Sequence, residues 1–140
     1  MESQVTWRSG LTFDVRQDGQ TIVLDAGPGC APSPGLRPKG LLLSGLGGCT
    51  GMDVVSILQK MKVPLEGLDI RVSAEVTDEH PKVFRHIHIR YIFKGKNLPL
   101  DKLERAVDLS RQQFCGVSAM LGKAAEISHE IVIEESPASA

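Results

Sequence analysis

A chain of 140 residues has the length of one domain and can bury a sizeable core. Hydrophobic residues at 41% and charged residues at 24% exclude the disordered and fibrous classes. The formal net charge of -1 and only six aromatic side chains (one Trp, one Tyr, four Phe) give no basis for binding nucleic acid or an anionic membrane surface. We therefore predict a single domain over residues 1–140, with residues 135–140 as a frayed tail.

The N-terminal quarter of the chain predicts short strands followed by a loop. Residues 5–7, 11–15 and 21–24 are typical of strands, and Gln-Asp-Gly-Gln at residues 17–20 is a strong hairpin turn. Residues 27–39 contain three glycines and four prolines, so we expect an irregular loop there, long enough to line a site.

The rest of the chain alternates helical and extended patterns. Pro38 suits the first turn of a helix, which we predict to run to about residue 62, before Pro64. Runs of strands and runs of helices without strict βαβ alternation indicate the α+β class, in the order βββ-α-ββ-αα-β. The remaining predicted elements are strands at 68–76 and 84–93, helices from residue 99 and at 116–125, and a strand at 130–134.

The apolar stretch at residues 41–58 crowds four glycines around Cys49. Each interior glycine costs a helix about 1 kcal/mol relative to alanine, so their presence needs a reason. Gly47 and Gly51 form a small-xxx-small pair that would let another helix pack closely. Glycines also leave room for a ligand or a second sulfur. With these glycines and Asp53, the stretch is a poor membrane span.

Three cysteines lie far apart in the sequence: Cys30, Cys49 and Cys115. This odd, sparse count, without a CxxC pair or an N-terminal secretory signal, favours a cytoplasmic protein without a zinc ribbon or a disulfide framework. The thiols are then either buried structural groups or reactive ones. Two crossing helices would bring Cys49 and Cys115 within disulfide reach, but the sequence leaves this open.

A reactive cysteine needs its thiolate, which the helix does not supply here. Cys49 lies about three turns into the predicted helix, beyond the reach of the positive N-terminus. Asp53, one turn further on, would oppose ionisation. Arg37 precedes Cys49 by about 18 Å of helix and cannot reach the sulfur from the same helix. A cation would therefore have to come from elsewhere, such as a partner subunit.

Two cysteine motifs together resemble the OsmC/Ohr family, in particular its OsmC-like, YhfA-type branch. The first is RPKGLLLSGLGGCTGMDVVSIL at residues 37–58, and the second is FCGVSAMLGK at residues 114–123. The segments at 7–13, 86–90 and 106–110 fit as well, so the resemblance covers nearly the whole chain. It implies an α+β fold, built as an intertwined homodimer with central, buried cysteine-bearing helices and outer antiparallel sheets.

The resemblance also implies a thiol peroxidase that reduces organic hydroperoxides. Cys49 would be the peroxidatic thiolate that becomes a sulfenic acid, and Cys115 would resolve it as a disulfide. A dithiol reductant would restore both thiols, and no metal, haem or flavin is implied. Cys30 is either incidental or an alternative resolving thiol.

One departure from the family pattern concerns the partner of the thiolate. Catalytic branches carry a glutamate nine residues before the peroxidatic cysteine, where this chain has Gly40. That glutamate orients an arginine, for which Arg8 is the first candidate here, Arg37 the second and Arg16 the third. The loss favours an alternative function, a non-catalytic dimer that binds a small apolar ligand. A third reading is a purely structural pair of cysteines.

Overall fold

The computed structural model describes residues 1–26 and 35–136, so Cys30 and the end of the predicted tail lie outside the described residues. Contacts divide the chain into two compact units, Met1–Leu42 and a second that begins at Leu43. The prediction of a single domain stays a prediction. The described elements are β1 (Gln4–Ser9), β2 (Thr12–Gln17), β3 (Gln20–Leu24), α1 (Pro38–Lys60), β4 (Gly67–Val76), β5 (Phe84–Gly95), α2 (Leu100–Leu109), the π-helix η1 (Ser110–Phe114), α3 (Gly116–Leu121) and β6 (Glu126–Glu135).

The first unit contains an antiparallel sheet in the order β1-β2-β3. The predicted hairpin turn is confirmed: Gln17 pairs with Gln20 across a two-residue loop. Asp18 and Gly19 both have positive φ, at 47° and 79°, as the tight turns that suit twisted strands require. The predicted order βββ-α-ββ-αα-β is confirmed over the residues that the structure describes, with η1 as an addition between the second and third helices.

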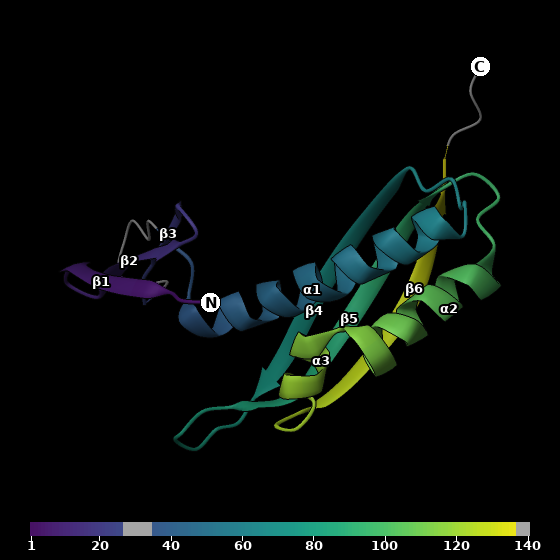
Figure 1. Ribbon diagram of the computed structural model, residues 1–140. Helices are drawn as coiled ribbons and strands as arrows, with labels where there is room; N and C mark the ends of the chain where they lie inside the picture. The colour runs from purple at the N-terminus through teal and green to yellow at the C-terminus, as the bar shows by residue number, and fades with distance from the viewer. Residues whose placement is uncertain (27–34, 137–140) are drawn as a thin grey trace. The chain divides into compact units, whose positions relative to one another are not determined.

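The second unit contains a sheet in the order β4-β5-β6, with the helices on one of its faces (Figure 1). Strands β4 and β5 are antiparallel, as predicted, whereas β5 and β6 are parallel. This corrects the expectation of purely antiparallel sheets. The reason is the long connection through α2, η1 and α3, which returns the chain to the end of the sheet where β5 began, as a parallel crossover must.

The last strand begins at Glu126, four residues before the predicted start. The sequence there reads as polar, because Ser128 and His129 interrupt the apolar alternation. Ser128 lies on β6 beside two histidines of β5, and its Oγ is 2.8 Å from Nε2 of His86 and 2.7 Å from Nδ1 of His88. Hydrogen bonds across neighbouring strands thus extend the strand beyond its apolar part.

The core of the second unit lies between the sheet and α1. On β5, alternate residues from Ile87 to Phe93 are fully buried, as a strand with one covered face requires. On α1, every fourth residue from Leu46 to Leu58 is at most 1% exposed, which gives one buried stripe along the helix. Leu103, Ala106 and Val107 of α2 belong to the same cluster.

The glycines of α1 face two different surroundings. A Cβ on Gly51 would lie 2.8 Å from Cδ1 of Ile70, and one on Gly47 would lie 3.2 Å from Cγ2 of Val72. This pair therefore gives clearance to strand β4, which corrects the expectation that a second helix is its partner. A Cβ on Gly45 or Gly48 would meet nothing within 4 Å among the described residues.

By length and composition alone α1 could cross a membrane, since an 18-residue window of it has a mean hydropathy of 1.6. Core helices of soluble proteins pass the same test. Of that window, 22% is buried, as the stripe that packs on the sheet of its own chain. The predicted cytoplasmic location stays a prediction.

Candidate functional site

The structure brings together the two cysteines that the sequence singles out. Cys49 lies near the middle of α1 and is half-buried, and Cys115 precedes α3 and is 3% exposed. Their sulfur atoms and a carboxylate oxygen of Asp53 all lie within 4.8 Å of one another. Both cysteines are free thiols, and forming a disulfide would require the two sulfurs to approach to the bonding distance of about 2.05 Å.

The π-helix η1 positions Cys115. After Phe114 the chain leaves the helical conformation, and Cys115 adopts extended backbone angles (φ -77°, ψ 102°) as the N-cap of α3. Its backbone N–H donates to the carbonyl of Ser110 at 2.7 Å, and its Sγ accepts from the N–H of Ser118 at 3.3 Å. A π-helical turn re-aims the residues that follow it and recurs at functional sites. Here it directs a buried sulfur toward α1.

A chain of buried hydroxyl groups ends on Asp53. Ser110 Oγ donates to Asp53 Oδ2 at 3.0 Å, Thr50 Oγ1 lies 2.8 Å from Ser110 Oγ, and Tyr91 Oη lies 2.7 Å from Thr50 Oγ1. Because each hydroxyl has one proton, the bond to Asp53 sets the direction of the whole chain. Tyr91 donates to Thr50, and Thr50 donates to Ser110. Burial raises the pKa of Tyr91, which keeps its phenol protonated and able to donate.

The electrostatic surroundings of Cys49 favour its thiol over its thiolate. Burial raises its pKa, the N–H of Val117 lowers it, and the neighbouring Cys115 and Asp53 raise it further. The net direction is upward. This agrees with the expectation that Asp53 opposes ionisation, so at neutral pH the thiolate is the minor form within the single chain.

We therefore expect Cys49 to react with iodoacetamide at a rate that still rises with pH above about 8.5, where an ordinary cysteine is half ionised. In Asp53→Asn the curve should shift to lower pH, because removing a negative charge favours the thiolate. Peptide mass spectrometry of the reduced protein, in the presence of a chelator, measures each cysteine separately. A rate for Cys49 that levels off below pH 8 would contradict the expectation.

The three arginines proposed from the sequence, Arg8, Arg37 and Arg16, lie in the first unit. Arg8 is on β1, and its Nε donates to Asp14 Oδ2 at 3.2 Å in an exposed ion pair. Arg37 is exposed and directly precedes α1, and Gly40 is in the first turn of that helix. Their roles stay predictions.

Another arginine, Arg111, was not predicted from the sequence. It lies on η1, donates to the carbonyl of Ile127 at 2.8 Å, and hydrogen-bonds to Nδ1 of His129. Its Nε is buried without a hydrogen-bond partner among the described residues. Burial, and then the charge of Arg111, lower the pKa of His129, which therefore stays neutral and accepts the bond. Arg111 thus joins η1 to β6, and no feature of the sequence alone marked it.

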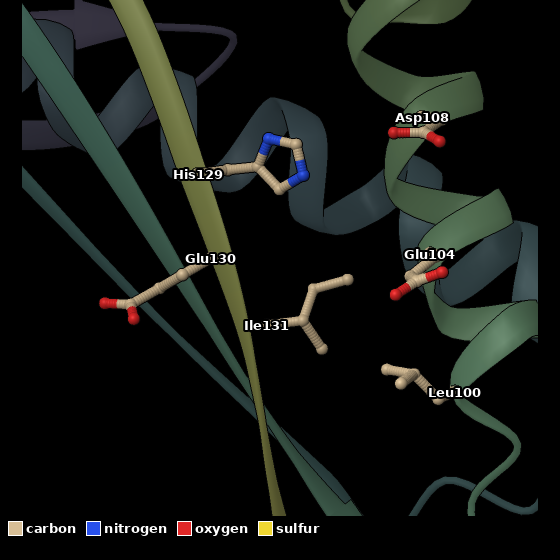
Figure 2. A pocket seen from close by; sticks show the side chains of 6 residues that line it. All are labelled: Leu100, Glu104, Asp108, His129, Glu130 and Ile131. Atoms are coloured by element: carbon tan, nitrogen blue, oxygen red, sulfur yellow. The ribbon is translucent and has the colours of Figure 1, made fainter.

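A pocket of about 440 Å³ lies between α2 and β6 (Figure 2). Figure 2 shows His129 and Ile131 extending from β6 toward α2, while Glu130 points to the other side of the strand. Neither Cys49 nor Cys115 lines this pocket, so it is separate from the site that the two cysteines form. Its lining residues are Leu100, Glu104, Asp108, His129, Glu130 and Ile131.

Comparisons with family models, with curated proteins and with solved structures all lead to the same family. The model of the OsmC-like protein family matches residues 31–130. Protein YhfA of Escherichia coli K12 is 38% identical over 131 residues, which cover 92% of this chain and 95% of YhfA. A crystal structure of a protein from Aquifex aeolicus VF5 is similar at 30% identity with a TM-score of 0.81, covering 95% of this chain and 96% of that one.

More distant structures share the fold. An organic hydroperoxide resistance protein, OsmC, from Legionella pneumophila is 14% identical with a TM-score of 0.71, covering 94% of this chain and 95% of that one. The similarity to YhfA confirms the resemblance seen in the two cysteine motifs. The chain belongs to the OsmC-like family.

Proposed function

We propose that the protein is a thiol peroxidase that reduces organic hydroperoxides, with Cys49 as the peroxidatic and Cys115 as the resolving cysteine. The observation that carries the proposal is the proximity of the two sulfurs, which come from different elements and lie within 4.8 Å. The family supports it, because members from Legionella pneumophila and Bacillus subtilis are named organic hydroperoxide resistance proteins.

The chemistry needs only thiols. The Cys49 thiolate attacks the distal oxygen of the hydroperoxide, the O–O bond breaks, and the leaving alkoxide takes up a proton to become the alcohol. Cys49 is then a sulfenic acid. The Cys115 sulfur attacks it, water leaves, and a disulfide forms. An external dithiol reduces this disulfide in two exchange steps and is itself oxidised.

Formation of the thiolate is the step that the single chain supports least, because the pKa of Cys49 is raised. We propose that an arginine lowers it, with Arg8 first and Arg37 second. If so, Arg8→Gln should slow hydroperoxide reduction far more at neutral pH than at pH 10, where the thiolate forms without help. Equal slowing at both pH values would count against this role, and Arg37→Gln is then the next variant to compare.

The protein is further proposed to act as a homodimer. Along α1, Gly45, Gly48 and Met52 form an exposed stripe, and Met52 is 76% exposed in the single chain. Near the other cysteine, Phe114 is 58% and Met120 is 66% exposed. Large apolar side chains exposed together commonly mark an interface. A second copy would cover them and give the thiols apolar surroundings suited to an organic hydroperoxide.

The dimer gives a prediction for Met52→Asp. A buried, unpaired charge at the interface should convert dimer to monomer at micromolar protein, which sedimentation velocity measures. Gln59→Asp, which adds the same charge at an exposed position near the end of α1, should leave the dimer intact and serves as the control. A Met52→Asp protein that sediments like the parent would exclude this face from the interface.

The peroxidase proposal is tested by titrating the reduced protein with cumene hydroperoxide. Each equivalent consumed should remove two thiols per chain and release one cumyl alcohol. A dithiol such as dithiothreitol should restore both thiols and allow repeated turnover. The proposal fails if hydroperoxide is not consumed and Cys49 remains a free thiol.

A second candidate function is a dimeric binding protein for a small apolar ligand. Gly40, in place of the family's glutamate, and the raised pKa of Cys49 favour it. Native mass spectrometry of the purified protein would show a ligand that copurifies in stoichiometric amount. Absence of such a ligand together with rapid hydroperoxide turnover would exclude this candidate.

A further inference from the structure

The proposed peroxide chemistry uses the two sulfurs but gives no role to Asp53. A carboxylate beside a peroxidatic cysteine opposes thiolate formation, so it is a cost to that reaction. Its position is nevertheless well defined, with Oδ2 held by Ser110 at 3.0 Å. Among the described residues, Asp53 forms no ion pair. The thiols of Cys49 and Cys115 and the carboxyl of Asp53 therefore lie close together, without an ion-pair partner in the described part of the chain.

We propose that Cys49, Cys115 and Asp53 bind a thiophilic divalent cation such as Zn²⁺. The three side chains offer two sulfurs and one carboxylate oxygen, all within 4.8 Å of one another. Sulfur ligands at about 2.3 Å from a tetrahedral zinc ion lie about 3.8 Å apart. Distances between the ligand atoms would therefore have to shorten by about 1 Å at most for the two sulfurs to bind one ion. Within residues 1–26 and 35–136 this is the one group of three such ligands.

The donor set favours zinc-like ions over harder ones. Two thiolates select soft or borderline cations such as Zn²⁺, Co²⁺ and Cd²⁺, whereas Mg²⁺ and Ca²⁺ prefer oxygen ligands alone. A third ligand from a carboxylate is compatible with zinc. Three protein ligands leave a fourth tetrahedral position for water. Binding displaces the two thiol protons to solvent.

Neighbouring hydrogen bonds hold the ligands in place, as in known metal sites. Ser110 fixes one oxygen of Asp53 and leaves Oδ1 for the cation. Behind Ser110, Thr50 and Tyr91 continue the one-way hydroxyl chain into the core, so the carboxylate is oriented by a buried structure. The N–H of Ser118 holds the sulfur of Cys115 at 3.3 Å.

A bound cation would also regulate the thiols. This regulation rests on the proposed peroxidase function: the cation would hold both sulfurs as ligands and slow their reaction with hydroperoxide. Oxidation of the pair to the disulfide would, in turn, remove two of the three ligands and release the cation. The site would then exist only in the reduced protein.

The test uses the reduced, full-length protein and Co²⁺ or Cd²⁺ as probes. One equivalent per chain should give a thiolate-to-metal charge-transfer band whose intensity corresponds to two sulfurs, and Zn²⁺ should displace Co²⁺. Cys49→Ser and Cys115→Ser should each weaken the band by half or more. Asp53→Asn removes a direct ligand and should reduce affinity by at least about 10-fold, since even changes outside the ligand set cost about 10–100-fold. Asp108→Asn, a carboxylate change in the other pocket, is the matched control and should bind as the parent does.

Two results would overturn the site: absence of a charge-transfer band in the parent protein, or unchanged affinity in Asp53→Asn. Asp53→Asn keeps an oxygen that accepts from Ser110, and a circular dichroism spectrum and melting curve like the parent's identify it as folded. Should it unfold, Asp53→Glu, which keeps the carboxylate on a longer stem, replaces it and should still bind. The charge-transfer band is measured without hydroperoxide, so it does not depend on turnover. A protein that binds the cation but does not reduce hydroperoxide is thereby distinguished from one that reduces hydroperoxide but does not bind the cation.

Discussion

Replacing Cys49 with serine is expected to reduce hydroperoxide consumption to the rate seen without protein. The hydroxyl of serine is a far weaker nucleophile than a thiolate. Replacing Cys115 should have a different effect. The first oxidation can still occur, so one equivalent of hydroperoxide is consumed, but the sulfenic acid on Cys49 is not resolved.

A single-turnover measurement distinguishes the two variants. Cumene hydroperoxide is mixed with reduced protein, and its loss is followed together with trapping of sulfenic acid by dimedone. Cys115→Ser should give a dimedone adduct on Cys49, and Cys49→Ser should give none. Cys30→Ser is the control and should retain full turnover. Retained turnover in Cys49→Ser would show that another group carries the reaction.

The second large effect is expected at Thr50, the centre of the buried hydroxyl chain. Thr50→Val preserves shape but leaves Tyr91 Oη and Ser110 Oγ each without one hydrogen-bond partner in the core. Buried polar groups that lose a partner cost about 1–3 kcal/mol each, so we expect the free energy of unfolding to fall by about 2–4 kcal/mol. Urea denaturation measures it. Thr21→Val, at an exposed position of β3, should change it by less than about 0.5 kcal/mol.

A double-mutant cycle makes this prediction specific to the hydroxyl chain. In Thr50→Val with Tyr91→Phe, the unpaired phenol is absent, so the two changes together should cost less than the sum of the single costs, by about 1 kcal/mol or more. Additive costs would indicate that Thr50 and Tyr91 do not act through their hydrogen bond. The single Tyr91→Phe variant should be the mildest, since Thr50 still donates to Ser110.

Much of the fold could be predicted from local patterns. The turn at Asp18 and Gly19, the period-two alternation of β5 and the start of α1 at Pro38 are set by neighbouring residues, and each appears in the structure. The parallel pairing of β5 and β6 could not be predicted in this way. It depends on how two helices return the chain across the sheet, which is a property of tertiary packing.

The glycines of α1 illustrate the same limit. The sequence predicts that something packs closely against Gly47 and Gly51, but it does not tell a helix from a strand. The structure places Ile70 and Val72 of β4 there. The close approach was predicted correctly, and its partner was not, because a small surface on a helix fits any neighbour of suitable shape.

For the candidate site, the sequence identified the two cysteines and Asp53 and missed the hydroxyl groups around them. Cys49 and Cys115 stand out by residue type and by the family resemblance. Ser110 and Thr50 look like ordinary helix residues, and their connection to Asp53 exists only once α1 and η1 are packed together. An aspartate within an apolar helix was the one local signal of this network.

The central claim is that Cys49 and Cys115 form a redox pair. The most direct measurement is mass spectrometric mapping of disulfides after reduced protein has reacted with one equivalent of cumene hydroperoxide. The account predicts one crosslinked peptide that joins Cys49 to Cys115, with Cys30 free. A disulfide that joins either cysteine to Cys30, or two unmodified thiols at Cys49 and Cys115, would contradict it.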